Sequence, residues 1–134
     1  MATSVSGTKR AEDLLLGALA ALTLEGHTTL RVSDRSFHDH FGKALEVFRD
    51  AGGEIQVLAS EYHRDIVSET YDELDHALIA AEQHRFVSFP NPTYSRLHIK
   101  MTRRAAERLL ADWNESERSA FERAAESLRA SIER

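Results

Sequence analysis

The 134-residue sequence contains no cysteine and only two prolines. The absence of cysteine excludes disulfide bonds, thiolate metal ligands and cysteine nucleophiles. Long apolar segments are also missing, because the longest, Leu14 to Leu24, is interrupted by Gly17 and Thr23 and is too short to cross a bilayer. We therefore expect a cytoplasmic protein that does not contact the membrane and that folds by burying apolar side chains.

The sequence also lacks the motifs that carry catalysis or nucleotide binding: G-x-S-x-G, the P-loop, G-x-G-x-x-G and H-E-x-x-H. Its 22 acidic residues are scattered at the spacings of solvated helix faces. His38 and His40 form an H-x-H pair, but two such side chains on a helix point about 200° apart and do not share one ion. We therefore expect no enzymatic activity, no bound metal and no cofactor.

The composition, with 42% hydrophobic and 29% charged residues, is that of an ordinary globular protein. A chain of this length buries roughly two-thirds of the surface of its unfolded state. The segment at the start, MATSVSGT, is rich in serine, threonine and glycine. We therefore predict a flexible tail at residues 1–8 and a single domain at residues 9–134.

Apolar periodicity predicts several helices in the first two thirds of the chain. One covers Lys9 to Glu25, and a second begins after Asp34 or Ser36 and ends at Gly52. Residues 54–62 fit strand alternation and helical spacing equally, and we favour a helix there. A short β-branched run, Thr28 to Val32, is a candidate strand, and a further helix is predicted from Ser68 or Thr70 to Gln83.

Residues 85–108 carry most of the information on function. Six basic residues and one acidic residue give this window a formal charge of +5, in a chain whose total is −5. Arg85 to Phe89 and Arg96 to Met101 are β-rich runs separated by a proline-containing turn, which predicts a hairpin. Thr102 is a helix cap, and a capping box at residues 114–117 begins the last helix. A basic hairpin on an acidic body indicates that a polyanion binds at this edge.

A regular pattern of mostly apolar residues surrounds this hairpin. It is carried by Leu78, Ala81, Phe86, Val87, Leu97, Ile99, Thr102, Ala105, Leu109 and Leu110. With this pattern, Leu74 to Leu110 resembles the second half of the winged helix-turn-helix domain of MarR-type and PadR-type bacterial regulators.

The resemblance implies a mainly α fold with a small β-hairpin, in which a winged helix-turn-helix is flanked by N- and C-terminal helices. It also implies a transcriptional regulator that binds double-stranded DNA through a basic wing. The residues expected to contact nucleic acid are Arg85, Tyr94, Arg96, His98, Lys100, Arg103 and Arg104.

Two features of the sequence depart from that family. His84 and Arg85 replace the usual glycine before the first wing strand. The helix expected to enter the DNA groove holds five acidic residues: Asp65, Glu69, Asp72, Glu73 and Asp75. Because carboxylates repel phosphates, the alternative is a protein interaction module, or a small subunit of a larger complex, that contacts its partner through Asp72, Glu73 and Asp75.

Two apolar stripes indicate how the chain packs or assembles. In the last helix, Phe121, Ala125, Leu128 and Ile132 recur at spacings of four, three and four residues. The first helix carries a second stripe. Either stripe closes the core of the monomer or, as the resemblance implies, meets its copy across a two-fold axis. We expect a homodimer, with an interface formed by Leu15, Leu22, Phe121, Leu128 and Ile132.

Overall fold

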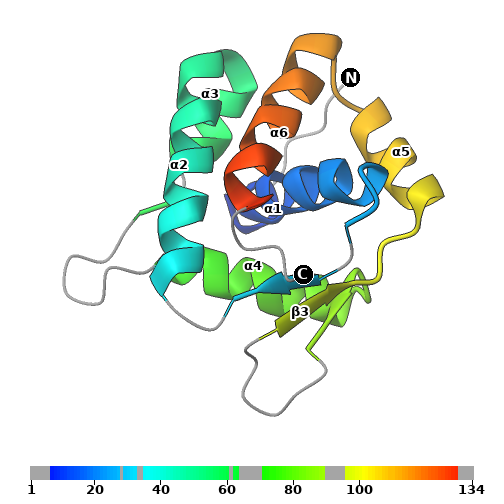
Figure 1. Cartoon of the computed structure of the whole chain (residues 1–134). Coiled ribbons are helices and arrows are strands. Elements are labelled where there is room, and N and C mark those ends of the chain that lie inside the picture. Colours follow the sequence, from blue (N-terminus) through cyan, green and yellow to red (C-terminus); the bar gives the residue numbers. More distant parts are fainter. Residues whose placement is uncertain are drawn as a thin grey trace.

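The computed structural model describes residues 7–27, 29–32, 35–60, 62–63, 71–89 and 96–129. This part of the chain forms six helices and three strands (Figure 1). In chain order they are α1 (Gly7–Leu24), β1 (Thr29–Arg31), α2 (Arg35–Ala51), α3 (Gly53–Ser60), α4 (Asp72–Gln83), β2 (Val87–Ser88), β3 (Arg96–Ile99), α5 (Arg103–Ala111) and α6 (Glu115–Leu128). The protein is therefore mainly helical with a small antiparallel sheet, and the helix favoured at residues 54–62 is confirmed as α3.

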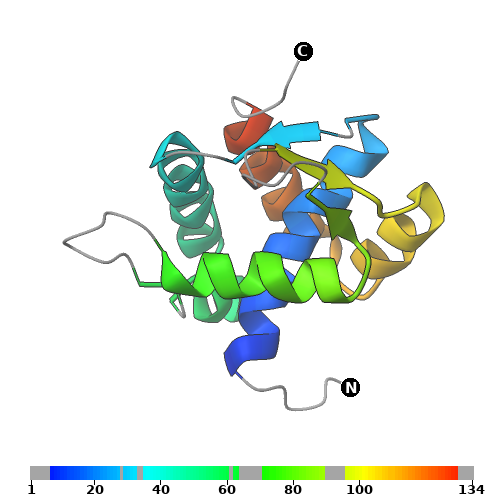
Figure 2. The ribbon, with the colours of Figure 1, turned by 90° about the horizontal axis from the view of Figure 1, so that it is seen from below.

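Helix α1 lies at the centre of the molecule. Every residue from Leu14 to Leu22 is buried, and α3, α4, α5 and α6 all contact this helix (Figures 1 and 2). A helix that is apolar on all sides needs neighbours on all sides. Gly17 allows α6 to approach closely, because a methyl group at this position would overlap the ring of Phe121.

The predicted dimer interface is wrong for the side chains that the structure describes. Leu15, Leu22, Phe121 and Leu128 are each 0% exposed in the single chain, where they belong to its core. The ring of Phe121 packs edge-on against Phe48, with ring centroids 5.2 Å apart. Because both apolar stripes close the monomer itself, they are not available to a second copy. Ile132 lies outside the described residues, and the homodimer stays a prediction.

Two helix starts, those of α5 and α6, lie where local sequence signals placed them. The hydroxyl oxygen of Thr102 accepts the backbone N–H of Ala105 at 3.0 Å and caps α5. The capping box of α6 is complete, since Asn114 Oδ1 accepts the N–H of Glu117 at 2.8 Å and Glu117 Oε1 accepts the N–H of Asn114 at 3.0 Å. Helix α1 begins at Gly7, inside the predicted tail, and residues 1–6 lie outside the described part.

The three strands form an antiparallel sheet in the order β1-β3-β2. On one face Leu30 pairs with Leu97 and Val87 with Ile99, and all four side chains are buried against the helices. Because side chains alternate along a strand, the neighbouring residues point to the opposite, outer face. Figure 2 shows the sheet and α4 on the same side of the molecule.

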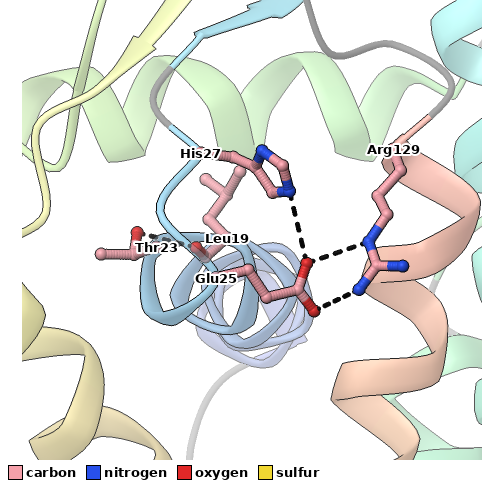
Figure 3. Close-up of polar contacts among 5 residues, drawn as sticks. All are labelled: Leu19, Thr23, Glu25, His27 and Arg129. Atoms are coloured by element: carbon pink, nitrogen blue, oxygen red, sulfur yellow. Dashed lines mark hydrogen bonds and ion pairs between the residues drawn. The ribbon is translucent and has the colours of Figure 1, made fainter.

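A pair of charged residues ties the end of α1 to the end of α6 (Figure 3). Arg129 donates two hydrogen bonds to the carboxylate of Glu25, from Nε at 2.9 Å and from a terminal nitrogen at 2.6 Å. The hydrogen bonds to Glu25 raise the pKa of Arg129 above its ordinary value. His27 Nε2 lies 3.6 Å from the same carboxylate. This contact fixes the turn that leads into β1.

Within the described ranges, no helix is both long and apolar enough to cross a bilayer.

Candidate nucleic-acid interface

The outer face of the sheet carries basic residues from two strands. On β3, Arg96 is exposed and His98 is half-buried, whereas Leu97 and Ile99 between and beyond them face the core. The register places Arg31 of β1 directly opposite Arg96. Side chains opposite each other on one sheet face have Cβ atoms about 4.5–5.5 Å apart, and like charges in this position repel. The outer face of the sheet therefore carries two exposed arginines from neighbouring strands.

Arg31 was not among the residues predicted to contact nucleic acid. It lies far from residues 85–108 in sequence, and only the pairing of β1 with β3 brings it to Arg96. One signal was present, because Arg31 is the sole charged residue in the β-branched run from Thr28 to Val32. The strand register that pairs Arg31 with the hairpin cannot be inferred from that run.

Arg85 lies between α4 and β2 in a left-handed backbone conformation, with a φ of 65°. It is exposed, and the hydrogen bonds around it close the last turn of α4: its N–H donates to the carbonyl of Glu82 at 3.0 Å, and that of Phe86 donates to Ala81 at 2.9 Å. A residue with a Cβ pays roughly 1–2 kcal/mol for this conformation, which is why glycine usually occupies it.

The hairpin places Arg85 beside the end of β3. The carbonyl of Phe86 accepts the N–H of Lys100 at 2.7 Å and that of Met101 at 3.1 Å. Two residues of one strand opposite one residue of its partner form a β-bulge, which ends the pairing. Lys100 is exposed at this bulge, so Arg85 and Lys100 flank the base of the hairpin.

The start of α5 continues the series of cations. Arg103 and Arg104 are exposed in its first turn, which contains no acidic residue. Positive charge at this end of a helix opposes the helix dipole and costs about 0.3–1 kcal/mol at low salt. Arg103 lies 3.8 Å from Glu107 one turn later. Exposed ion pairs of this kind contribute little, so the local charge stays positive.

We name these exposed cations the basic surface. It comprises Arg31, Arg85, Arg96, Lys100, Arg103 and Arg104, which lie on β1, on both sides of the hairpin base and at the start of α5. Five of the seven residues predicted to contact nucleic acid are thus exposed in the described part of the chain, and Arg31 is a further exposed cation that was not predicted. His98 is half-buried beside them on β3, and Tyr94 lies outside the described residues.

The acidic residues predicted to bind a protein partner have different environments. Glu73 is half-buried and its carboxylate accepts the N–H of His63 at 3.1 Å. Asp75 is exposed on α4, with its carboxylate 3.7 Å from His38 Nε2. The structure does not describe the side chain of Asp72. The exposed face of α4 also carries Glu82 and Ile79, which is 52% exposed.

His38, the first histidine of the pair in α2, is held by a hydrogen bond to the backbone. His38 is buried, and its Nδ1 accepts the backbone N–H of Tyr71 at 3.0 Å. Among the described residues, no group of three or more histidines or carboxylates is arranged to hold an ion.

Comparisons of the whole chain with protein families, with curated proteins and with solved structures gave no match.

Proposed function

We propose that this protein is a winged-helix protein that binds double-stranded DNA through the phosphates, using the basic surface. A regulatory role in transcription is the corresponding biological role. The chain as a whole is acidic, so the attraction is local: it depends on cations gathered at one edge and weakens steeply with salt.

The order of the elements supports the winged-helix assignment. A strand, β1, follows the first helix and pairs with the second strand of the hairpin, so that β3 is central in the sheet. Helix α4 precedes the hairpin and lies on the same side of the molecule as the sheet (Figure 2). In this proposal α4 is the recognition helix and the hairpin is the wing.

The observation that carries the proposal is that exposed cations from two paired strands lie opposite each other on the outer sheet face, and that two more begin α5. Arg31 and Arg96 are directly opposite each other, and Arg103 and Arg104 oppose the dipole of α5. Sequences violate local rules of this kind mainly where function requires it. The phosphates of a polyanion interact favourably with cations placed in this way.

The character of the outer sheet face favours contact with phosphates over stacking on bases. Binding of single strands relies on exposed aromatic rings. Here Phe86 and Phe89, the two phenylalanines that flank β2, are partly buried and pack against the core. His98 is the sole aromatic residue on the outer face among the described strand residues.

The experiment that tests the proposal is a titration of a labelled random-sequence duplex of 25 base pairs across a salt series. We expect log affinity to fall linearly with log salt, and the Arg31→Ala/Arg96→Ala variant to bind more weakly with a slope lower by about 2 units, roughly one per lost phosphate contact. The measurement is fluorescence anisotropy.

A matched control removes the same charge elsewhere. Arg118 and Arg123 are exposed on α6, which begins at the end of the molecule away from the sheet (Figure 1). The Arg118→Ala/Arg123→Ala variant should bind duplex as the wild type does. Equal losses in both variants would mean that only net charge matters, and absence of binding by the wild type at low salt would refute the proposal.

One observation favours protein interaction as a second candidate function. Ile79 is one of two large apolar side chains that are strongly exposed in the described part of the chain, and it lies on α4 between Asp75 and Glu82. An apolar centre with a charged rim is typical of protein interfaces. The two candidates predict different effects of charge changes on this helix face.

A further inference from the structure

Two helices in this protein end in the same way with different residues. At the end of α1, the N–H of His27 donates to the carbonyl of Leu22 at 3.1 Å and that of Gly26 to Thr23 at 3.0 Å. Gly26 has a φ of 93°. At the end of α4 the corresponding bonds are made by Phe86 and Arg85, with arginine in the position of Gly26. Both ends have the Schellman pattern, for which glycine is the ordinary residue.

Nothing in the backbone at Arg85 requires an arginine. The N–H groups of His84, Arg85 and Phe86 all donate to carbonyls in the last turn of α4, so no backbone group is left to bind an anion. A cation near the C-terminus of a helix interacts favourably with the helix dipole, but this does not require a left-handed residue. What distinguishes arginine from glycine here is the exposed guanidinium.

The backbone places Arg85 next to the basic residues at the base of the hairpin. Arg85 directly precedes Phe86, whose carbonyl is bonded to the N–H of Lys100 at 2.7 Å. Lys100 is followed, after Met101 and the Thr102 cap, by Arg103 and Arg104. Arg85 is thus the link between α4 and the cations at the base of the hairpin.

We propose that Arg85 is a phosphate-binding residue, retained in a left-handed conformation because its guanidinium, together with Lys100, binds the DNA backbone next to α4. This inference rests on the proposed function. Backbone strain that persists at a surface position is expected where it contributes to function. Arginine suits this role because its planar group binds a phosphate with two hydrogen bonds.

The test is Arg85→Gly in the full chain, measured by thermal unfolding and by duplex titration. Because glycine adopts the required φ freely, the melting temperature should be at least that of the wild type, with a rise of about 3 °C. Duplex affinity should fall roughly three- to tenfold at low salt, and the salt slope should fall by about 1 unit. Arg85→Lys keeps the charge but loses the paired hydrogen bonds, so its salt slope should equal that of the wild type and its affinity should lie between those of the wild type and Arg85→Gly.

The outcomes separate this inference from the proposed function. If Arg85→Gly leaves affinity unchanged while Arg31→Ala/Arg96→Ala weakens it, the role of Arg85 is refuted and DNA binding stands. If Arg85→Gly lowers the melting temperature, the arginine stabilises the fold and the inference also fails. If the wild type binds no duplex, both proposals fail together.

Discussion

At the scale of single residues, the environment of His38 indicates a structural role for this side chain. It is 8% exposed, and apart from the tyrosines it is the one polar residue that is buried in the described part of the chain. Its Nδ1 accepts the N–H of Tyr71, so the proton of the neutral ring is on Nε2, which faces Asp75 at 3.7 Å. Tyr71 immediately precedes α4. His38 therefore fixes the position at which α4 begins.

Replacing His38 tests this function. His38→Leu leaves the buried N–H of Tyr71 without an acceptor and should lower the free energy of unfolding by about 1–3 kcal/mol. His38→Asn keeps an acceptor oxygen close to the position of Nδ1 and should recover part of the loss. Urea denaturation measures both variants. Equal destabilisation of the two would show that ring packing, and not the hydrogen bond, is what matters.

Residues whose partners lie within one helical turn could be predicted from the sequence. Thr102 and the capping box from Asn114 to Glu117 are examples, since their hydrogen bonds join residues three apart. Arg31 was missed because its neighbour Arg96 is set by strand register. The left-handed conformation of Arg85 depends on how α4 ends and how the hairpin begins. In the sequence, its one indication was that His84 and Arg85 replace the glycine that is usual before the first wing strand.

At the scale of elements, the contact between α1 and α6 determines the core. The sequence predicts both apolar stripes, but a stripe does not reveal whether it meets another helix of the same chain or a second copy. The structure shows Phe121 seated over Gly17. A glycine that only interrupts an apolar run in the sequence is thus the point at which two helices come closest.

Gly17→Ala tests this contact because two effects have opposite signs. Alanine is the better helix former by about 1 kcal/mol, yet its methyl group would overlap the ring of Phe121. We expect overpacking to dominate and stability to fall by about 1–3 kcal/mol in chemical denaturation. Gly42→Ala is the milder comparison, since a Cβ there would lie 3.0 Å from the hydroxyl of Tyr71. Stabilisation by Gly17→Ala would contradict the close packing.

At the scale of the whole molecule, charge is divided between surfaces. Residues 85–108 carry a formal +5 in a chain of −5, so the remaining residues sum to −10. The exposed face of α4, with Asp75 and Glu82, lies on the same side of the molecule as the sheet (Figure 2). A duplex bound to the basic surface therefore has acidic side chains nearby, and these limit its affinity.

Reversing the charges on α4 discriminates between the two candidate functions. If the protein binds DNA, Asp75→Lys/Glu82→Lys removes repulsion, and duplex affinity at low salt should rise about tenfold in the anisotropy titration. If α4 binds a protein partner instead, we expect no change in duplex affinity. The exposed surface around Ile79 is then the candidate contact with that partner. Glu122→Lys/Glu126→Lys on α6 makes the same charge change away from α4 and is the control.

The central position of α1 has a consequence for synthesis on the ribosome. Helix α1 is translated before the helices that cover it, and Phe121, which packs on Gly17, is in the last described helix. Its apolar surface therefore cannot be completely buried by native contacts until about a hundred further residues have left the exit tunnel. During that time the nascent chain exposes a strongly apolar segment, which is the kind of sequence that chaperones protect.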